Sequence, residues 1–117
     1  MNTLMKTKFS SKIALVALLL SCLVGWSAHA GDVNQIWATK CASCHGKDGK
    51  GLTTMGRKLS IKDLTDAKVQ ASFTDADATK AIKEGISDNG TQKMKALGDK
   101  LSDDDVKALV AHVRSLK

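Results

Sequence analysis

The run Cys41-Ala42-Ser43-Cys44-His45 constrains this chain more than any other feature. Two Cys residues three positions apart lie on one face of a helix, so both thiols can reach one flat group. The next residue, His45, is held beside them. This C-x-x-C-H spacing is the attachment signature of a c-type haem, in which the thiols add to two vinyl groups and the His ligates the iron. The chain is therefore expected to fold around one covalently held haem.

Two other types of site that contain Cys and His, a zinc site and a redox-active dithiol, fit the sequence less well than haem attachment does. A structural zinc site needs four ligands, but the remaining Cys is Cys22, far upstream, and the remaining downstream His is His112. A redox-active dithiol of the thioredoxin type needs a βαβ context, and no strand pattern surrounds the motif.

Residues 1–30 have the features of a secretory signal peptide. Three lysines precede a continuous apolar run, Ile13 to Leu20, and Ala28-His29-Ala30 is a small-x-small cleavage sequence. We expect cleavage after Ala30, export to the periplasm, and a single mature domain of residues 31–117. No stable insertion in the membrane is expected after cleavage.

Two alternatives for the N-terminal segment remain. A retained membrane anchor would need about 20 predominantly apolar residues, whereas the segment Ile13–Trp26 is only 14 residues long. A lipoprotein signal, Leu19-Leu20-Ser21-Cys22, would instead leave a lipidated Cys22 as the first residue. The cleavage sequence further along favours ordinary secretion.

The composition of the mature domain limits its function. Three of the 18 basic residues and none of the 12 acidic ones lie in residues 1–30, so the net charge falls from +6 to +3. Nucleic-acid binding is therefore not implied. An 87-residue domain whose aromatic residues are Trp37 and Phe73 has a small core. A haem would fill its centre, and the chain without haem is expected to be largely unfolded.

The apolar periodicity predicts an all-helical domain. A first helix begins at Asp32, with Gln35 as its capping-box partner, and carries the C-x-x-C-H motif near its end. A glycine-rich loop follows. A short helix is expected over residues 65–71, a longer one from Thr74 to Glu84 with Gly85 after it, an irregular loop over residues 86–101, and a last helix beginning at Ser102.

The mature chain resembles small bacterial class I cytochromes c over nearly its whole length. The resemblance lies in Trp37, the motif, and the glycines and lysines of residues 46–51, together with residues 98–102 and the last helix. It implies about four helices around one haem c, with the first and last helices crossing and Trp37 packed near Leu109 and Val113.

The resemblance also implies a methionine as the sixth iron ligand, in the position of Met94. The cofactor-binding residues would then be Cys41, Cys44, His45 and Met94, with His45 and Met94 bound to the metal. A thioether ligand raises the reduction potential relative to two imidazoles. Met55 and His112 are the rival ligands. Met55 follows the motif too closely, and His112 lies off the apolar stripe of its helix, so we expect it to be a surface or rim imidazole.

The sequence departs from the family in having no Pro and no Tyr. Relatives often carry Pro after the glycine at the position of Gly56, where a nearby carbonyl accepts the proximal imidazole N–H, and Pro beside the ligand Met. Arg57 and Lys95 stand at these positions here. The partner that fixes the imidazole is therefore open, and no phenol is available to a haem propionate.

These features predict a monomeric periplasmic electron carrier rather than an enzyme, with oxidases, reductases or dehydrogenases as redox partners. A haem enzyme or gas sensor with an open sixth position is one alternative, and an electron-entry domain of a larger oxidoreductase is another. Six lysines near the ligand segments could steer an acidic partner, against the alternative of an ordinary soluble surface: Lys47, Lys50, Lys58, Lys93, Lys95 and Lys100.

Overall fold

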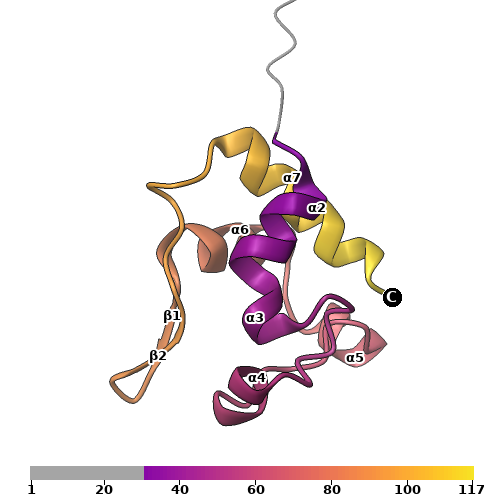
Figure 1. The fold of residues 1–117 in the computed structure, drawn as a ribbon, viewed down its shortest axis with the longest axis vertical. Coiled ribbons are helices and arrows are strands. Elements are labelled where there is room, and N and C mark those ends of the chain that lie inside the picture. Colours follow the sequence, from indigo (N-terminus) through magenta and orange to yellow (C-terminus); the bar gives the residue numbers. More distant parts are fainter. Residues whose placement is uncertain (1–30) are drawn as a thin grey trace, which may run out of the picture.

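The computed structural model describes residues 31–117, so the expected signal peptide and Cys22 lie outside the described residues. The described part is mostly helical, with one small two-stranded sheet. Figure 1 shows the first helix, in indigo, crossing the last helix α7 (Asp103–Ser115), in yellow, which confirms the expected helical fold. None of the described helices has the length and apolar character that a membrane span requires.

The first helix consists of three consecutive segments. These are α2 (Val33–Ile36), a wider π-helical stretch η1 (Trp37–Cys41) and α3 (Ala42–His45). The Asp32 side chain accepts the Asn34 N–H at 3.0 Å, which caps the helix without the Gln35 capping box that was expected. A π-helical turn holds an extra residue, so the side chains after it rotate relative to those before it. The stretch η1 ends at Cys41, the first Cys of the motif.

The segment after the motif contains more helix than the sequence predicted. The expected glycine-rich loop includes a short helix α4 (Thr54–Lys58). The next helix, α5 (Ala67–Ala71), begins later than expected because Asp66 caps it, accepting the N–H groups of Lys68 at 2.7 Å and Val69 at 3.2 Å. A carboxylate in this position satisfies donors that the first helical turn leaves free.

The two longest helices begin as predicted. Helix α6 (Asp75–Glu84) starts with a capping box between Thr74 and Asp77, and α7 starts with one between Ser102 and Asp105. Both boxes satisfy backbone donors at the helix start and place a carboxylate at the positive end of the dipole. Gly85 follows α6 with a φ of 75°, as expected for a glycine after a helix end.

The chain between α6 and α7 is not the irregular loop that was expected. It forms an antiparallel hairpin of β1 (Ile86–Asp88) and β2 (Thr91–Met94). The turn residues Asn89 and Gly90 both have positive φ, 48° and 76°. An irregular register places Met94 opposite Ile86, where the hairpin joins the body. The hairpin lies to one side of the helices in Figure 1.

The core joins the first helix to α6 and α7. Trp37 belongs to the same buried cluster as Leu109 and Val113, so the predicted packing of Trp37 on the last helix is confirmed. The remaining members of the cluster are Cys41, Ile82, Val106 and Val110. The Gly31 N–H also donates to the Asp105 carboxylate at 2.6 Å, which ties the start of the described chain to the start of α7.

Candidate functional site

A large cavity lies beside the first helix. Its volume is about 580 Å³, within the roughly 300–1,000 Å³ range of small-molecule and cofactor pockets. Its walls come from the first helix, from the chain between α4 and α5, and from α5, α6, the hairpin and α7. Most of the lining is apolar: Trp37, Leu59, Ile61, Leu64, Val69, Phe73, Ala78, Ala81, Ile82, Ile86, Leu97, Leu109 and Val113.

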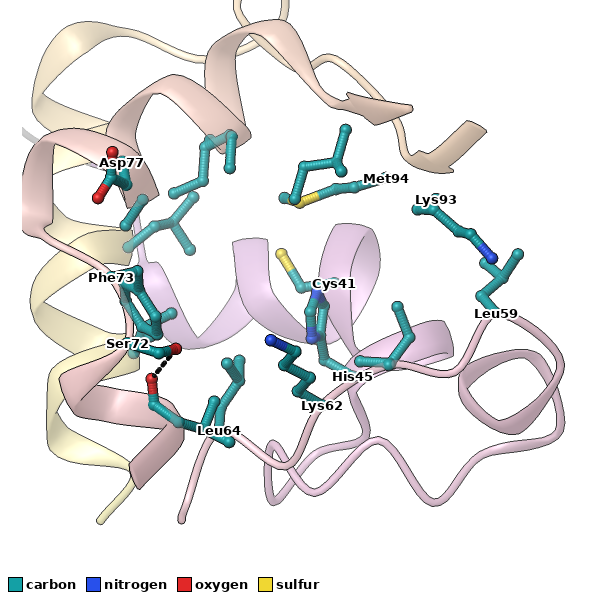
Figure 2. A pocket seen from close by; sticks show the side chains of 18 of the residues that line it. Cys41, His45, Leu59, Lys62, Leu64, Ser72, Phe73, Asp77, Lys93 and Met94 are labelled. Atoms are coloured by element: carbon teal, nitrogen blue, oxygen red, sulfur yellow. Dashed lines mark hydrogen bonds between the residues drawn. The ribbon is translucent and has the colours of Figure 1, made fainter. Parts of the chain in front are cut away.

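The first cysteine of the motif faces this cavity. Cys41 is buried at the end of η1, and Figure 2 shows its sulfur pointing into the cavity. Burial raises the pKa of Cys41 to about 11, because an apolar environment disfavours the thiolate. Cys44 is half-buried on α3 and does not line the cavity, although it lies on the next turn of the same helix.

His45 lies at the end of α3 and also lines the cavity. Burial lowers the pKa of His45 below its usual value, which favours the neutral imidazole that binds metals. Its Nδ1 is buried and has no hydrogen-bond partner among the described residues. The residues near Gly56 therefore do not supply the carbonyl acceptor that related proteins have. The other ring nitrogen remains available to a ligand in the cavity.

Three hydrogen bonds from outside α3 fix the backbone around the motif. The indole N–H of Trp37 donates to the Gly46 carbonyl at 3.1 Å, in a buried position. The Thr53 hydroxyl donates to the Cys44 carbonyl at 2.8 Å, and the Gly51 N–H donates to the His45 carbonyl at 2.7 Å. These bonds use carbonyls that the end of a helix leaves without partners. In the folded protein, the backbone of the motif is thus fixed by Trp37 on one side and by the glycine-rich segment on the other.

Met94 lines the cavity from the hairpin. It is half-buried at the end of β2, and Figure 2 shows its sulfur on the side of the cavity opposite His45. The chain after Met94 returns to α6, where the Leu97 N–H donates to the Ile82 carbonyl at 2.9 Å. A thioether and an imidazole therefore face each other across an apolar space, which is an arrangement that could bind both faces of a flat iron complex.

The two rival ligands do not line the cavity. Met55 lies on α4 with 44% of its surface exposed. His112 is half-buried rather than exposed, and its ring packs on Trp37 with a 4.8 Å distance between ring centroids. The expectation of a surface or rim imidazole is therefore wrong: His112 packs on the Trp37 ring and does not line the cavity. The Nε2 of His112 is buried without a partner in the described part of the chain.

The charged residues of the lining were only partly anticipated. Of the six lysines noted in the sequence, Lys93 lines the cavity. Lys62 lines it as well, together with the acidic residues Asp77 and Asp88. No motif marks Lys62. Its position follows from the path of the chain between α4 and α5.

The donor set fits a c-type haem. A porphyrin needs a flat apolar space, which the lining supplies, and the iron takes nitrogen and sulfur ligands, which His45 and Met94 could provide. A thiol for covalent attachment, Cys41, faces the same space, with Cys44 three residues further along the helix. Two features fit less well: the buried Nδ1 of His45 has no hydrogen-bond partner among the described residues, and Cys44 does not line the cavity.

Comparison with known proteins agrees with this description. Residues 28–113 match the family described as cytochrome c oxidase, cbb3-type, subunit III. Among solved structures, the KustC0563 c-type cytochrome is similar, with a TM-score of 0.65 and 34% identity over 74% of this chain and 98% of that one. A single-site variant of the same cytochrome gives a TM-score of 0.63 at 34% identity, over 74% of this chain and 99% of that one.

A curated relative is longer than this chain. The chain is 31% identical over 115 residues to the cbb3-type cytochrome c oxidase subunit FixP of Azorhizobium caulinodans. The match covers 98% of this chain and 36% of FixP, so the chain spans about a third of the length of that relative.

Proposed function

The chain belongs to the family of cbb3-type cytochrome c oxidase subunit III, and on that premise we propose that it carries single electrons on one covalently bound haem c. The observation that supports this most directly is the apolar cavity that Cys41, His45 and Met94 share. Haem supplies an Fe(II)/Fe(III) couple when it is bound. The protein contributes the covalent anchors, the axial ligands and a medium of low polarity.

Each site residue has one proposed role. Cys41 and Cys44 form the two thioethers that hold the haem. His45 ligates the iron from the side of the first helix, and Met94 ligates it from the hairpin. A thioether favours the ferrous state relative to a second imidazole, and the apolar lining disfavours the extra positive charge of the ferric state. Both effects raise the reduction potential.

The proposed domain arrangement follows the sequence. Residues 1–30 are removed as a signal peptide after Ala30, and residues 31–117 form the haem domain in the periplasm. The positive segment, apolar run and cleavage sequence of the first thirty residues support this proposal.

The proposed partners are proteins that exchange electrons with the haem, and we propose that the domain itself is monomeric and binds no nucleic acid. FixP is named as an oxidase subunit, and the chain corresponds to about a third of it. Electron delivery to or within a larger oxidoreductase complex is therefore the most direct version of the proposal, with a freely diffusing shuttle as the other.

The sharpest test replaces Met94 by Ala in the haem-loaded protein. Losing the thioether should leave the iron with an open position, give a high-spin spectrum and allow carbon monoxide to bind. The potential should fall on the order of 0.1 V, within the range of about 0.8 V over which axial ligands set haem potentials. Visible absorption spectra with and without carbon monoxide, and a redox titration, measure these changes.

Met55→Ala and His112→Ala are matched controls, because both residues lie outside the cavity lining. Both variants should keep a low-spin spectrum. An unchanged spectrum and potential in Met94→Ala, combined with a high-spin iron in His112→Ala, would instead assign the iron to two imidazoles. A wild-type protein that already binds carbon monoxide readily would favour a haem enzyme or gas sensor with an open site.

A further inference from the structure

The cavity has an uneven distribution of charge. A haem carries two propionate carboxylates, and a carboxylate beside an apolar wall is costly unless a cation or hydrogen-bond donor compensates it. The two cationic side chains that line the cavity in the described residues are Lys62 and Lys93. The chain contains no Tyr that could donate a phenol hydrogen bond.

The backbone on both sides of Lys62 is fixed. Lys62 lies in the extended chain between α4 and α5, where the Ile61 N–H donates to the Gly56 carbonyl at 2.9 Å. Two residues after Lys62, the Leu64 N–H donates to the Gly49 carbonyl at 2.9 Å. Lys62 is thus held between two anchors on the glycine-rich segment that follows the haem-attachment motif. Figure 2 shows its side chain extending towards the middle of the cavity.

The charge of Lys62 is not compensated by a neighbour. The three ion pairs among residues 31–117 involve Lys80, Lys83 and Arg114. The adjacent carboxylate of Asp63 accepts the N–H and the hydroxyl of Thr65, at 2.8 and 2.6 Å. Lys62 lines the cavity although the residue is exposed, so it lies where the cavity meets solvent.

The other ionisable groups of the lining are less suited to this role. Lys93 precedes Met94 on β2, and in Figure 2 its side chain points towards Leu59 rather than into the middle of the cavity. Asp77 and Asp88 would repel a carboxylate, and Asp77 already binds the hydroxyl of Thr74 at 2.8 Å. Cys41 and His45 are used for attachment and ligation in the proposed function.

We propose that Lys62 binds and neutralises a haem propionate. This inference rests on the proposed function, because it requires a haem in the cavity. The ammonium group keeps the propionate ionised and cancels its negative charge near the iron. The negative charge of an uncompensated propionate would stabilise the ferric state, so Lys62 raises the reduction potential and limits its dependence on pH.

The test compares Lys62→Gln, Lys62→Arg and Lys93→Gln in the haem-loaded protein. Redox titrations between about pH 5 and pH 8 should show a lower potential for Lys62→Gln at the alkaline end, because an ionised propionate then lacks its cation. The potential should rise more steeply with falling pH than in the wild type, because the propionate takes up a proton more readily. Lys62→Arg should restore the wild-type profile, and Lys93→Gln should leave the slope unchanged.

Redox-induced infrared difference spectra give a second readout. Lys62→Gln should show the carbonyl stretch of a protonated propionic acid at a higher pH than the wild type does. Equal pH profiles and infrared spectra in the wild type and Lys62→Gln would overturn the assignment, as would the same steepening in Lys93→Gln. In both cases a normal low-spin spectrum would leave the proposed function intact. A wild-type protein that takes up no haem would overturn both proposals.

Discussion

Gly56 lies close to the backbone of Cys44 in the attachment motif and to that of Gly51. Its N–H donates to the Thr53 hydroxyl at 2.8 Å, and that hydroxyl donates to the Cys44 carbonyl at 2.8 Å. A methyl group on Gly56 would overlap the carbonyl oxygens of Gly51 and Cys44. Neither oxygen can rotate away, because both belong to the backbone. A residue without a side chain is therefore required here for steric reasons rather than for an unusual φ angle.

Gly56→Ala should lower the free energy of unfolding by about 1–3 kcal/mol, the usual cost of adding atoms to a filled site. It should also change the visible spectrum or the potential, because the carbonyl it displaces precedes His45. Chemical denaturation and redox titration measure the two effects. Gly90→Ala is the control: its φ of 76° is strained for Ala, but no atom lies within 4 Å. A loss of stability with an unchanged haem signal is expected there, and the same result in Gly56→Ala would contradict this account.

At the scale of single residues, the sequence identified the chemistry but not all of the surroundings. Cys41 and His45 could be assigned because their spacing is specific, and the structure brings both to one cavity. Lys62 could not, because an isolated lysine carries no local signal and its position depends on hydrogen bonds to the distant Gly49 and Gly56.

Among the secondary-structure elements, those with local signals were the ones predicted well. The boxes at Thr74 and Ser102 depend on residues three positions apart, so the sequence contains the whole interaction. Asn89-Gly90 is a strong signal for a two-residue turn, but the hairpin was not predicted, because its strands have three and four residues, most of them polar, and show no clear alternation of apolar and polar residues. The π-helical stretch has no comparable local signal, although its first and last residues, Trp37 and Cys41, are both part of the buried core.

The cap of α7 gives a prediction about stability. Ser102→Ala should lower the free energy of unfolding by about 1 kcal/mol, because its hydroxyl accepts the Asp105 N–H at 3.1 Å. Ser87→Ala, on the exposed strand β1, should change it by less than about 0.5 kcal/mol. Thermal or denaturant unfolding of the haem-loaded protein measures both. Equal values for the two variants would show that the cap contributes nothing.

The loss of stability in Ser102→Ala should depend on pH, because the cap includes the carboxylate of Asp105. Hydrogen bonds from the Ser102 hydroxyl, and then from the Gly31 and Ser102 N–H groups, hold the pKa of Asp105 below its usual value. The carboxylate therefore stabilises the fold above the unfolded pKa of about 3.9, and this contribution is lost as the pH falls through the lowered folded pKa. The difference in the free energy of unfolding between the wild type and Ser102→Ala should become smaller at acidic pH. A difference that becomes larger there would contradict the role given to the Asp105 carboxylate.

For the whole molecule, the cavity is large compared with the core that surrounds it. Among residues 31–117, seven hydrophobic residues are buried, and five of them also line the cavity: Trp37, Cys41, Ile82, Leu109 and Val113. Each wall faces an apolar space of about 580 Å³ that side chains do not fill. A domain of this size is only marginally stable. The architecture could be predicted from the sequence because its local signals agree with one another. The attachment motif requires a haem, and a haem at the centre fills the space between the crossing first and last helices.

A chain that cannot attach haem should therefore lose its fold. The double variant Cys41→Ala/Cys44→Ala should contain no haem that survives acid–acetone extraction, and its far-UV circular dichroism should show little helix without a cooperative thermal transition. Cys22→Ala is the control and should leave the haem content of the mature protein unchanged, as intact mass measures. A double variant that remains helical and unfolds cooperatively would show that the polypeptide core suffices.

The hydrogen bond between Gly31 and Asp105 would become an ion pair if the chain is cut after Ala30. The Gly31 nitrogen, 2.6 Å from the Asp105 carboxylate, would then change from a neutral amide to a charged ammonium group. The precursor and the mature protein would differ by one ion pair at the start of α7, where Asp105 already caps the helix. Removal of the signal peptide would then add an ion pair between the new N-terminus and the last helix, so that a step of export also increases the stability of the fold.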